Sequence, residues 1–115
     1  DNEIKAWWYR PLENQVPGGE TLVEVAERSA QAVRTILQQY PEEQVLIVSH
    51  GGVIRCIVAA ALGIDLNQHW RLRQDNAALS IIDFYQRNKA ILTLYNDCSH
   101  LAPGLVPKQI ITAKD

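Results

Sequence analysis

A histidine followed by two glycines is the part of this chain whose residue types and spacing best suit chemistry. The motif His50-Gly51-Gly52 follows the uncharged run Val45–Ser49 and precedes a longer apolar run, Val53–Leu62. The pattern predicts a buried strand, a tight turn and a helix, with the imidazole at the carboxyl end of the strand. In open α/β sheets, ligands collect at that edge, where helix amino termini present unpaired N–H groups. A histidine beside glycines that let a ligand approach the backbone therefore favours a bound anion, most often a phosphate.

Spacing alone leaves a structural alternative open. A histidine after a buried strand can simply cap a turn, and adjacent glycines are common in connections that bind nothing. Asn76, just before a predicted hairpin, has a similar ambiguity, because its side chain suits either a ligand pocket or a turn in which it bonds its own backbone. His69, between Gln68 and Trp70, is expected to carry no chemistry.

The motifs that the sequence lacks argue against several other kinds of site. An ester hydrolase would need a Gly-x-Ser-x-Gly nucleophile elbow, and no serine here has those flanking glycines. A dinucleotide site would need Gly-x-Gly-x-x-Gly, which is also absent. Cys56 and Cys98 are too few and too far apart for a disulfide framework, and no Cys-x-x-Cys or His-x-x-x-His spacing supports a metal. We therefore expect neither a metal nor a cofactor.

Composition places the chain among ordinary globular proteins. With 115 residues, 47% of them hydrophobic, it can form one domain with a core. Its net charge of −2 and its scattered basic residues give no electrostatic footprint for nucleic acid or an anionic membrane. No apolar run reaches about eighteen residues, and no amino-terminal signal pattern is present. We expect a cytoplasmic setting with reduced cysteines.

Helix signals are clear on both sides of the motif. Thr21 opens a capping box at the start of a predicted helix, which Pro41 ends. The second predicted helix is Val53–Leu62, and Gly63 terminates it. Arg55 is the only charge in this second helix, and we expect it to reach solvent or to pair with a carboxylate.

The elements predicted after the second helix are shorter. Leu66–Leu72 predicts a short helix that carries Trp70 inward. Leu79–Gln86 and Ala90–Tyr95 are rich in β-formers and predict a hairpin, with Asn88 able to adopt the left-handed conformation at its turn.

The predicted strand before the motif raises a question of pairing. Val45–Ser49 lacks the polar alternation of a half-exposed strand, so it predicts a strand covered on both faces with a parallel neighbour on each side. The chain has few strands to offer as neighbours. An isolated strand of this kind would leave an open apolar edge that invites pairing with another chain. We therefore expect a homodimer, strand exchange or a separately supplied partner segment.

Three landmarks along the chain occur in a characteristic order. The segment Pro17–Thr21 precedes a predicted helix, Ser49–Gly52 follows the aliphatic run, and Asn76 is followed by a closing stretch, Asn96–Leu101. Together they resemble the histidine phosphatase superfamily, the phosphoglycerate mutase-like proteins, and Ser49–Gly52 resembles its second-histidine motif. The resemblance covers nearly the whole chain. It implies an α/β fold of three layers, α/β/α, with a mixed and mostly parallel sheet.

The resemblance also indicates what these residues lack. The family's nucleophile is a histidine in an Arg-His-Gly motif, and no histidine here has those neighbours. The family's other active-site arginine and its acidic proton donor also lie upstream of the matched region. The chain begins at Asp1, where the family's carboxyl-terminal half would begin. We therefore expect residues 1–115 to form a single partial domain, truncated at its amino terminus, that holds half of an active site.

The resemblance implies phosphoryl transfer on a small phosphorylated metabolite. The missing histidine would attack phosphorus to form a phosphohistidine, which water would resolve. His50 would be the catalytic partner that donates a hydrogen bond to a phosphoryl oxygen, with the N–H of Gly51 as a second donor and Asn76 in a nearby loop. The expected activity is a phosphatase acting on a small phosphomonoester. Phosphoglycerate mutase activity and a non-catalytic anion-binding or interaction module remain alternatives, and His100 is expected to be structural.

Overall fold

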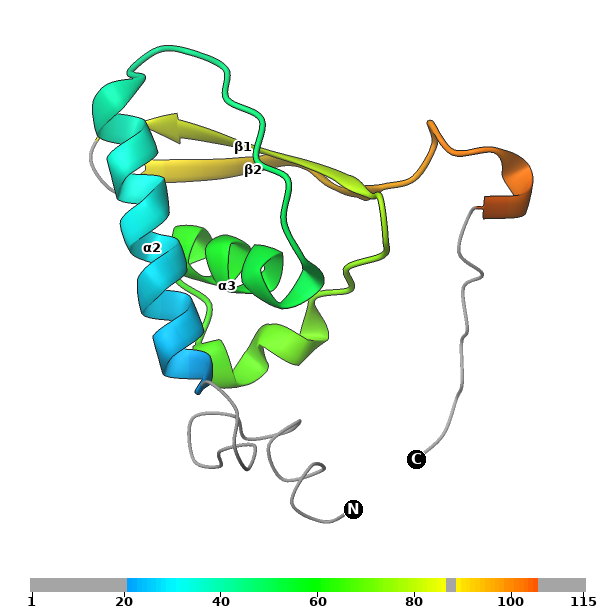
Figure 1. Ribbon diagram of the computed structural model, residues 1–115, viewed down its shortest axis with the longest axis horizontal. Coiled ribbons are helices and arrows are strands. Elements are labelled where there is room, and N and C mark those ends of the chain that lie inside the picture. The colour runs from blue at the N-terminus through cyan, green and yellow to red at the C-terminus, as the bar shows by residue number, and fades with distance from the viewer. Residues whose placement is uncertain (1–20, 87–88, 106–115) are drawn as a thin grey trace.

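The computed structural model describes residues 21–86 and 89–105, which form two helices, a hairpin and two short 3-10 helices. The helices are α2 (Leu22–Gln39) and α3 (Gly51–Leu62), and the strands are β1 (Leu79–Tyr85) and β2 (Lys89–Asp97). The 3-10 helices are η1 (Leu66–Arg71) and η2 (Pro103–Leu105). Figure 1 shows α2 and α3 on one side of the hairpin, and α3 contacts α2, β2 and η1. The helix that follows the glycine motif is therefore the centre of the packing.

The predicted amino-terminal cap of α2 is confirmed. The hydroxyl Oγ1 of Thr21 accepts a hydrogen bond from the backbone N–H of Glu24 at 3.1 Å, which satisfies one of the unpaired donors at the helix start. Leu22 and Ser29 are buried, and the Ser29 hydroxyl donates to the Val25 carbonyl at 2.7 Å. The cap stabilises the start of α2, and the buried face packs against the rest of the fold.

Helix α3 begins two residues earlier than the sequence predicts. Its first residue is Gly51, and His50 is its N-cap residue, so the glycine pair belongs to the first helical turn. The predicted end is confirmed, because Gly63 has a φ of 69° and its N–H returns to the carbonyls of Ala59 and Ala60. Val58 is 1% exposed and forms the core with Cys56 and Ala59.

The hairpin is confirmed as an antiparallel pair. Tyr85 pairs with Lys89 next to the turn and Leu79 pairs with Asp97 at the far end, with two register irregularities between them. Along β2 the half-buried side chains alternate with exposed ones, as a sheet covered on one face requires. The predictions for Asn88 and for Pro17–Glu20 fall outside the described residues.

The prediction of a strand over Val45–Ser49 is wrong for this structure. The segment is irregular, and Leu46 and Val48 are 79% and 87% exposed. A strand exists only through hydrogen bonds to a neighbour, and in the described residues the hairpin is the only sheet. The described residues combine helices with an antiparallel pair of strands, and they do not confirm the expected mostly parallel, three-layer arrangement.

The prediction that Trp70 points inward is also wrong. Trp70 is 40% exposed and lies under the guanidinium of Arg71, whereas its neighbour His69 is buried. The reason is helical geometry, because η1 is a 3-10 helix with about three residues per turn, which shifts the inward face relative to an α-helix. No helix of the described residues combines the length and apolar character needed to cross a membrane.

Candidate functional site

His50 occupies the junction between the irregular segment 45–49 and the first turn of α3. Its backbone is extended, with φ −107° and ψ 160°, and its carbonyl accepts the N–H of Ile54 at 3.0 Å. The imidazole makes no capping hydrogen bond and is exposed. The turn-capping alternative is therefore not supported, and within the described residues the exposed ring is accessible to a ligand.

All three residues predicted to bind phosphate line one cavity of about 560 Å³. His50 and Gly51 approach it from the start of α3, and Asn76 approaches it from the connection between η1 and β1. Gln74 and Asp75 also line the cavity, and Cγ of Gln74 lies 3.5 Å from the position that a Cβ on Gly51 would occupy, so the region where residues 50–51 and 74–76 meet is here called the polar end. The rest of the cavity is mostly apolar and is lined by α2, the segment 45–49, α3 and β1. A volume of this order suits a small ligand, with polar groups gathered at one end.

The start of α3 contributes backbone donors to the polar end. The first N–H groups of an α-helix have no partner within the helix, and they carry the positive end of its dipole. In α3 these groups follow His50 directly, and no acidic residue lies in the first turn to satisfy them. The electrostatics of the turn therefore favour an anion.

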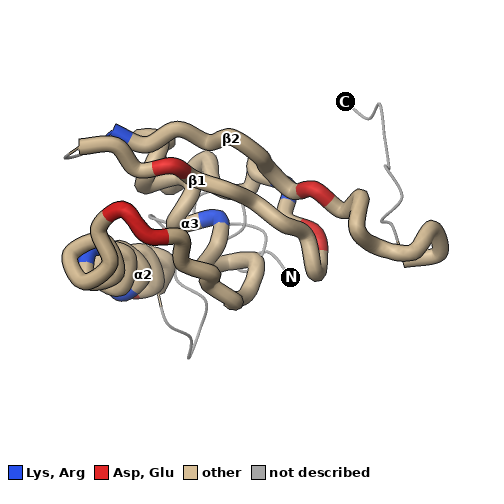
Figure 2. Tube along the Cα trace, turned by 90° about the horizontal axis from the view of Figure 1, so that it is seen from above, with Lys and Arg blue, Asp and Glu red and all other residues tan. Residues whose placement is uncertain are grey.

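Arg55 adds a positive charge to the same helix, where it is the only charged residue (Figure 2). Its Nε donates to the carbonyl of Leu72 at 2.8 Å, and it is half-buried. Within the described residues it forms no ion pair, so the predicted carboxylate partner is not found there. Its Nη1 lies 3.6 Å from the position that a Cβ on Gly51 would occupy. The positive charge of Arg55 therefore lies beside the first turn of α3 and close enough to Asp75 to contribute to lowering the pKa of that carboxyl.

Asp75 is a carboxylate at the cavity that the sequence did not single out. Nε of Arg73 donates to both of its oxygens, at 3.1 and 2.9 Å, and Nδ2 of Asn96 donates to Oδ2 at 2.7 Å. The hydrogen bond from Asn96, followed by those from Arg73 and the charge of Arg73, lowers the pKa of Asp75 from its usual value of 3.8. Asp75 is consequently ionised at neutral pH and is unsuited to donate a proton to a leaving group.

His50 also lines a second cavity, of about 250 Å³. Its lining combines polar and charged side chains with apolar ones from α2, α3 and η1: Leu22, Val25, Arg28, His50, Gly52, Val53, Arg55, the buried His69 and Trp70. Nδ1 of His69 has no hydrogen-bond partner in the described part of the chain, and burial together with the charge of Arg55 lowers the pKa of this imidazole. His69 is therefore neutral at pH 7.

The remaining histidine and the two cysteines are further side chains that could react or bind a ligand. His100 is exposed beyond the end of β2 and does not line either cavity. Both cysteines are free, and burial raises the pKa of the Cys56 thiol. Among residues 21–86 and 89–105, no cluster of three or more His, Cys, Asp or Glu side chains could hold a metal.

Comparison with known sequences identifies relatives over most of the chain. The model of the histidine phosphatase superfamily, branch 1, matches residues 1–97. The chain is 30% identical over 96 residues to phosphoserine phosphatase 1 of Hydrogenobacter thermophilus, with 84% of this chain and 46% of that protein covered. It is 33% identical over 114 residues to the probable phosphoglycerate mutase GpmB of Cronobacter sakazakii, covering 90% of this chain and 53% of that protein. The chain thus spans about half the length of the curated relatives it matches.

Comparison with solved structures gives the same kind of neighbour. YhfR of Bacillus stearothermophilus superposes with a TM-score of 0.78 at 26% identity, covering 86% of this chain and 49% of YhfR. A phosphoserine phosphatase mutant of Entamoeba histolytica, solved with phosphoserine, superposes with a TM-score of 0.65 at 20% identity, covering 74% and 43% of the two chains. The second likeness is one of fold alone.

Proposed function

Because this chain belongs to the histidine phosphatase superfamily, we propose that it forms part of a phosphoryl-transfer enzyme, a phosphatase that acts on a small phosphomonoester. The observation that supports the proposal is the meeting of His50, Gly51 and Asn76 at one cavity. They come from two connections that lie far apart in the sequence, and they bring an imidazole, a helix amino terminus and an amide to the same place. The phosphoryl group would occupy the polar end of that cavity.

His50 is the catalytic residue of this proposal. Its imidazole donates a hydrogen bond to an equatorial phosphoryl oxygen and stabilises the charge there during transfer. One strong donor of this kind contributes about 2.7–4 kcal/mol to the stability of a transition state. The N–H of Gly51 donates to a second phosphoryl oxygen, and the side-chain amide of Asn76 lies at the edge of the phosphate site. The nucleophile, a histidine that accepts the phosphoryl group, lies outside these 115 residues, since no Arg-His-Gly motif occurs among them.

The names of the relatives support two possible acceptors for the phosphoryl group of the phosphohistidine. Phosphoserine phosphatase 1 is named for hydrolysis and GpmB for mutase activity, and the two are similarly distant from this chain. In a phosphatase, water resolves the phosphohistidine; in a mutase, a second hydroxyl accepts the group. We propose hydrolysis, with mutase activity as the second candidate. Release of inorganic phosphate without an isomerised ester distinguishes the first from the second.

The apolar segment Val45–Val48 is proposed to be covered by a strand from outside the described residues. Leu46 and Val48 are largely exposed, although exposed aliphatic runs are rare in soluble proteins unless a partner covers them. We propose that a further strand, from a second copy of this chain or from a separately supplied segment, pairs with this backbone. Pairing would also fix His50, which directly follows the segment.

The experiment that tests the proposed activity compares two histidine variants. The chain is combined with the Arg-His-Gly segment of its protein, and hydrolysis of p-nitrophenyl phosphate is measured. His50→Ala is expected to lower turnover by about a hundredfold or more, because one strong donor to the transition state is lost. His100→Ala, an exposed histidine outside the cavity, is the matched control and should change turnover by less than about twofold. Equal turnover of His50→Ala and the unmodified protein would remove His50 from the mechanism.

A further inference from the structure

The connection Leu72–Ala78, here called the rim loop, brings Gln74, Asp75 and Asn76 to the cavity. One residue of this loop has a backbone conformation that its residue type disfavours. Ala77 has a φ of 61°, in the left-handed region that a residue with a Cβ adopts at a cost. A loop held in such a conformation needs restraints from the surrounding structure. The rim loop has two long-range restraints.

The first restraint is the side-chain amide of Asn96, at the end of β2. Nδ2 of Asn96 donates to Oδ2 of Asp75 at 2.7 Å, and Oδ1 accepts the backbone N–H of Asp75 at 2.9 Å. One amide thus binds both the side chain and the backbone of a single loop residue, and this pair of hydrogen bonds between Asn96 and Asp75 is here called the clamp. Only a side chain with a donor and an acceptor side by side can make both bonds.

Asn96 is itself held in place. Its backbone N–H donates to the hydroxyl Oγ of Ser80 on β1 at 3.0 Å, and its φ is 54°, which asparagine tolerates better than most residues. The left-handed backbone turns its amide toward the rim loop at the end of the sheet. Asn96 does not line either cavity in the described part of the chain.

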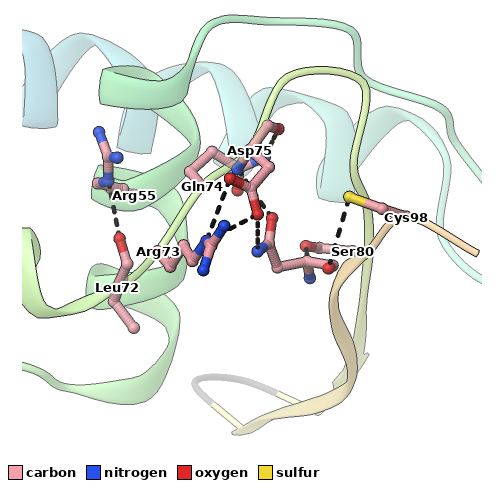
Figure 3. A network of polar contacts seen from close by, with 8 residues as sticks. Arg55, Leu72, Arg73, Gln74, Asp75, Ser80 and Cys98 are labelled. Atoms are coloured by element: carbon pink, nitrogen blue, oxygen red, sulfur yellow. Dashed lines mark hydrogen bonds and ion pairs between the residues drawn. The ribbon is translucent and has the colours of Figure 1, made fainter. Parts of the chain in front are cut away.

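The second restraint is Arg55 on α3. Its Nε–H bond to the Leu72 carbonyl fixes the start of the rim loop to the helix that carries Gly51 (Figure 3). Between the two restraints, the side chain of Gln74 packs on the turn, with its Cγ 3.5 Å from the position of a Cβ on Gly51. The hairpin and α3 therefore hold the rim loop from both sides.

We propose that Asn96 is a positioning residue, which clamps Asp75 so that the rim loop presents Asn76 to a phosphoryl group bound at His50 and Gly51. This inference rests on the proposed function. Asn96 touches no reacting atom and acts through Asp75 and Asn76. The clamp also occupies the carboxylate of Asp75 with donors, which keeps its negative charge from facing the anion.

The test is a double-mutant cycle between Asn96 and Asn76, read out by phosphate titration of the 115-residue chain in NMR. Asn96→Gly removes both side-chain bonds and tolerates a positive φ. It is expected to weaken phosphate binding about two- to tenfold, the range for lost hydrogen bonds, and to leave the Asn76 amide unresponsive while His50 and Gly51 still shift. Asn76→Ala should weaken binding to a similar extent. The double variant should bind no more weakly than Asn76→Ala, because Asn96 acts only through Asn76.

Two controls separate positioning from general destabilisation. Thr93→Ala removes a hydrogen bond from Thr93 Oγ1 to the Ile81 carbonyl in the same hairpin, and it should change thermal stability without changing phosphate affinity. Asp75→Asn keeps the backbone N–H bond to Asn96 Oδ1 and the size of the side chain but removes the charge that Asn96 Nδ2 and Arg73 Nε contact, and it provides the same test if Asn96→Gly does not fold. It should give a smaller loss of the Asn76 response.

The outcomes distinguish this inference from the proposed function. If phosphate shifts no amide of the unmodified chain at His50 or Gly51, the proposed site fails and the positioning role fails with it. If the unmodified chain responds but Asn96→Gly retains its affinity and its Asn76 shift, the positioning role alone is overturned. Losses that multiply in the double variant would also overturn it, because they would show that the two residues act independently.

Discussion

A Cβ on Gly51 would lie 3.5 Å from Cγ of Gln74, at an ordinary van der Waals distance. The first turn of α3 and the rim loop are therefore in contact, but the contact leaves room for one methyl group. Gly51 also lacks the positive φ that would strain a larger residue, in contrast to Gly63 at 69°. The glycine in the first turn of α3 is thus not required by the fold, whereas the glycine at its end is.

This contrast predicts opposite effects on stability at the two ends of α3. Gly51→Ala is expected to leave the free energy of unfolding within about 0.5 kcal/mol of the unmodified chain. The new methyl group would clash with no neighbour, and alanine has a higher helix propensity than glycine. Gly63→Ala should lower it by about 1–2 kcal/mol, because alanine is strained in the left-handed region. Urea denaturation followed by circular dichroism measures both, and an equal or larger loss for Gly51→Ala would contradict the geometry.

The contact between Asn96 and Asp75 predicts how the stability of the folded chain depends on pH. The direction of this dependence should reverse when Asn96 is replaced by an acidic residue. The pKa of Asp75 is lowered in the folded chain by Asn96 and then Arg73, so its stabilising effect is complete above its unfolded pKa and is lost as the pH falls through the lower, folded pKa. Asn96→Asp places a second carboxylate against Oδ2 of Asp75, and one of the pair must then have a raised pKa. That variant should be destabilised at about pH 7 and should regain stability on mild acidification.

Thermal melting as a function of pH measures this reversal. Asn96→Gly, which removes the clamp without adding charge, is the matched control and should show no recovery on acidification. If Asn96→Asp lost stability steadily from about pH 7 to pH 4, the close approach of the two side chains would be disproved.

The exposed segment Val45–Val48 predicts self-association. Leu46 and Val48 present aliphatic surface to solvent, and no described strand pairs with their backbone; such an edge promotes pairing between chains. Leu46→Glu combined with Val48→Glu is expected to shift the chain toward monomer in sedimentation velocity. Leu105→Glu, at an exposed leucine remote from the segment in sequence, is the matched control and should leave association unchanged. A monomeric unmodified chain would show that no second copy covers this surface.

The absence of an Arg-His-Gly motif predicts that the 115 residues alone do not hydrolyse phosphate esters. A two-histidine site that lacks its nucleophile has no group to accept the phosphoryl, and residues that act as one catalytic unit lose nearly all their effect together. Background rates are expected with p-nitrophenyl phosphate, with no acid-labile phosphohistidine. Turnover by the purified chain that His50→Ala abolishes would instead make His50 the nucleophile.

The parts of this fold that depend on local sequence could be predicted. The cap at Thr21, the termination of α3 at Gly63 and the hairpin each follow from residues within a few positions of one another. The resemblance to a family, which carries tertiary information that spacing alone lacks, predicts phosphate contacts for His50 and Asn76, and both residues line one cavity.

The remaining features depend on contacts between distant residues. The bond between Asp75 and Asn96 spans 21 positions, and it exists because the hairpin returns the end of β2 to the rim loop. Val45–Ser49 has the composition of a strand, but its state depends on a neighbour that the described residues do not provide. The inward position of His69 rather than Trp70 depends on the 3-10 geometry of η1, which an assumed α-helical period misplaces.

The most direct test of the central claim is a phosphate titration of the 115-residue chain, followed by amide chemical shifts. The account predicts that the amides of His50, Gly51 and Asn76 shift together with a single weak affinity, because all three line the polar end of one cavity. His50→Ala should reduce that affinity, and His100→Ala should preserve it. Shifts confined to other parts of the chain, or none at high phosphate concentration, would contradict the assignment of this cavity as the phosphate site.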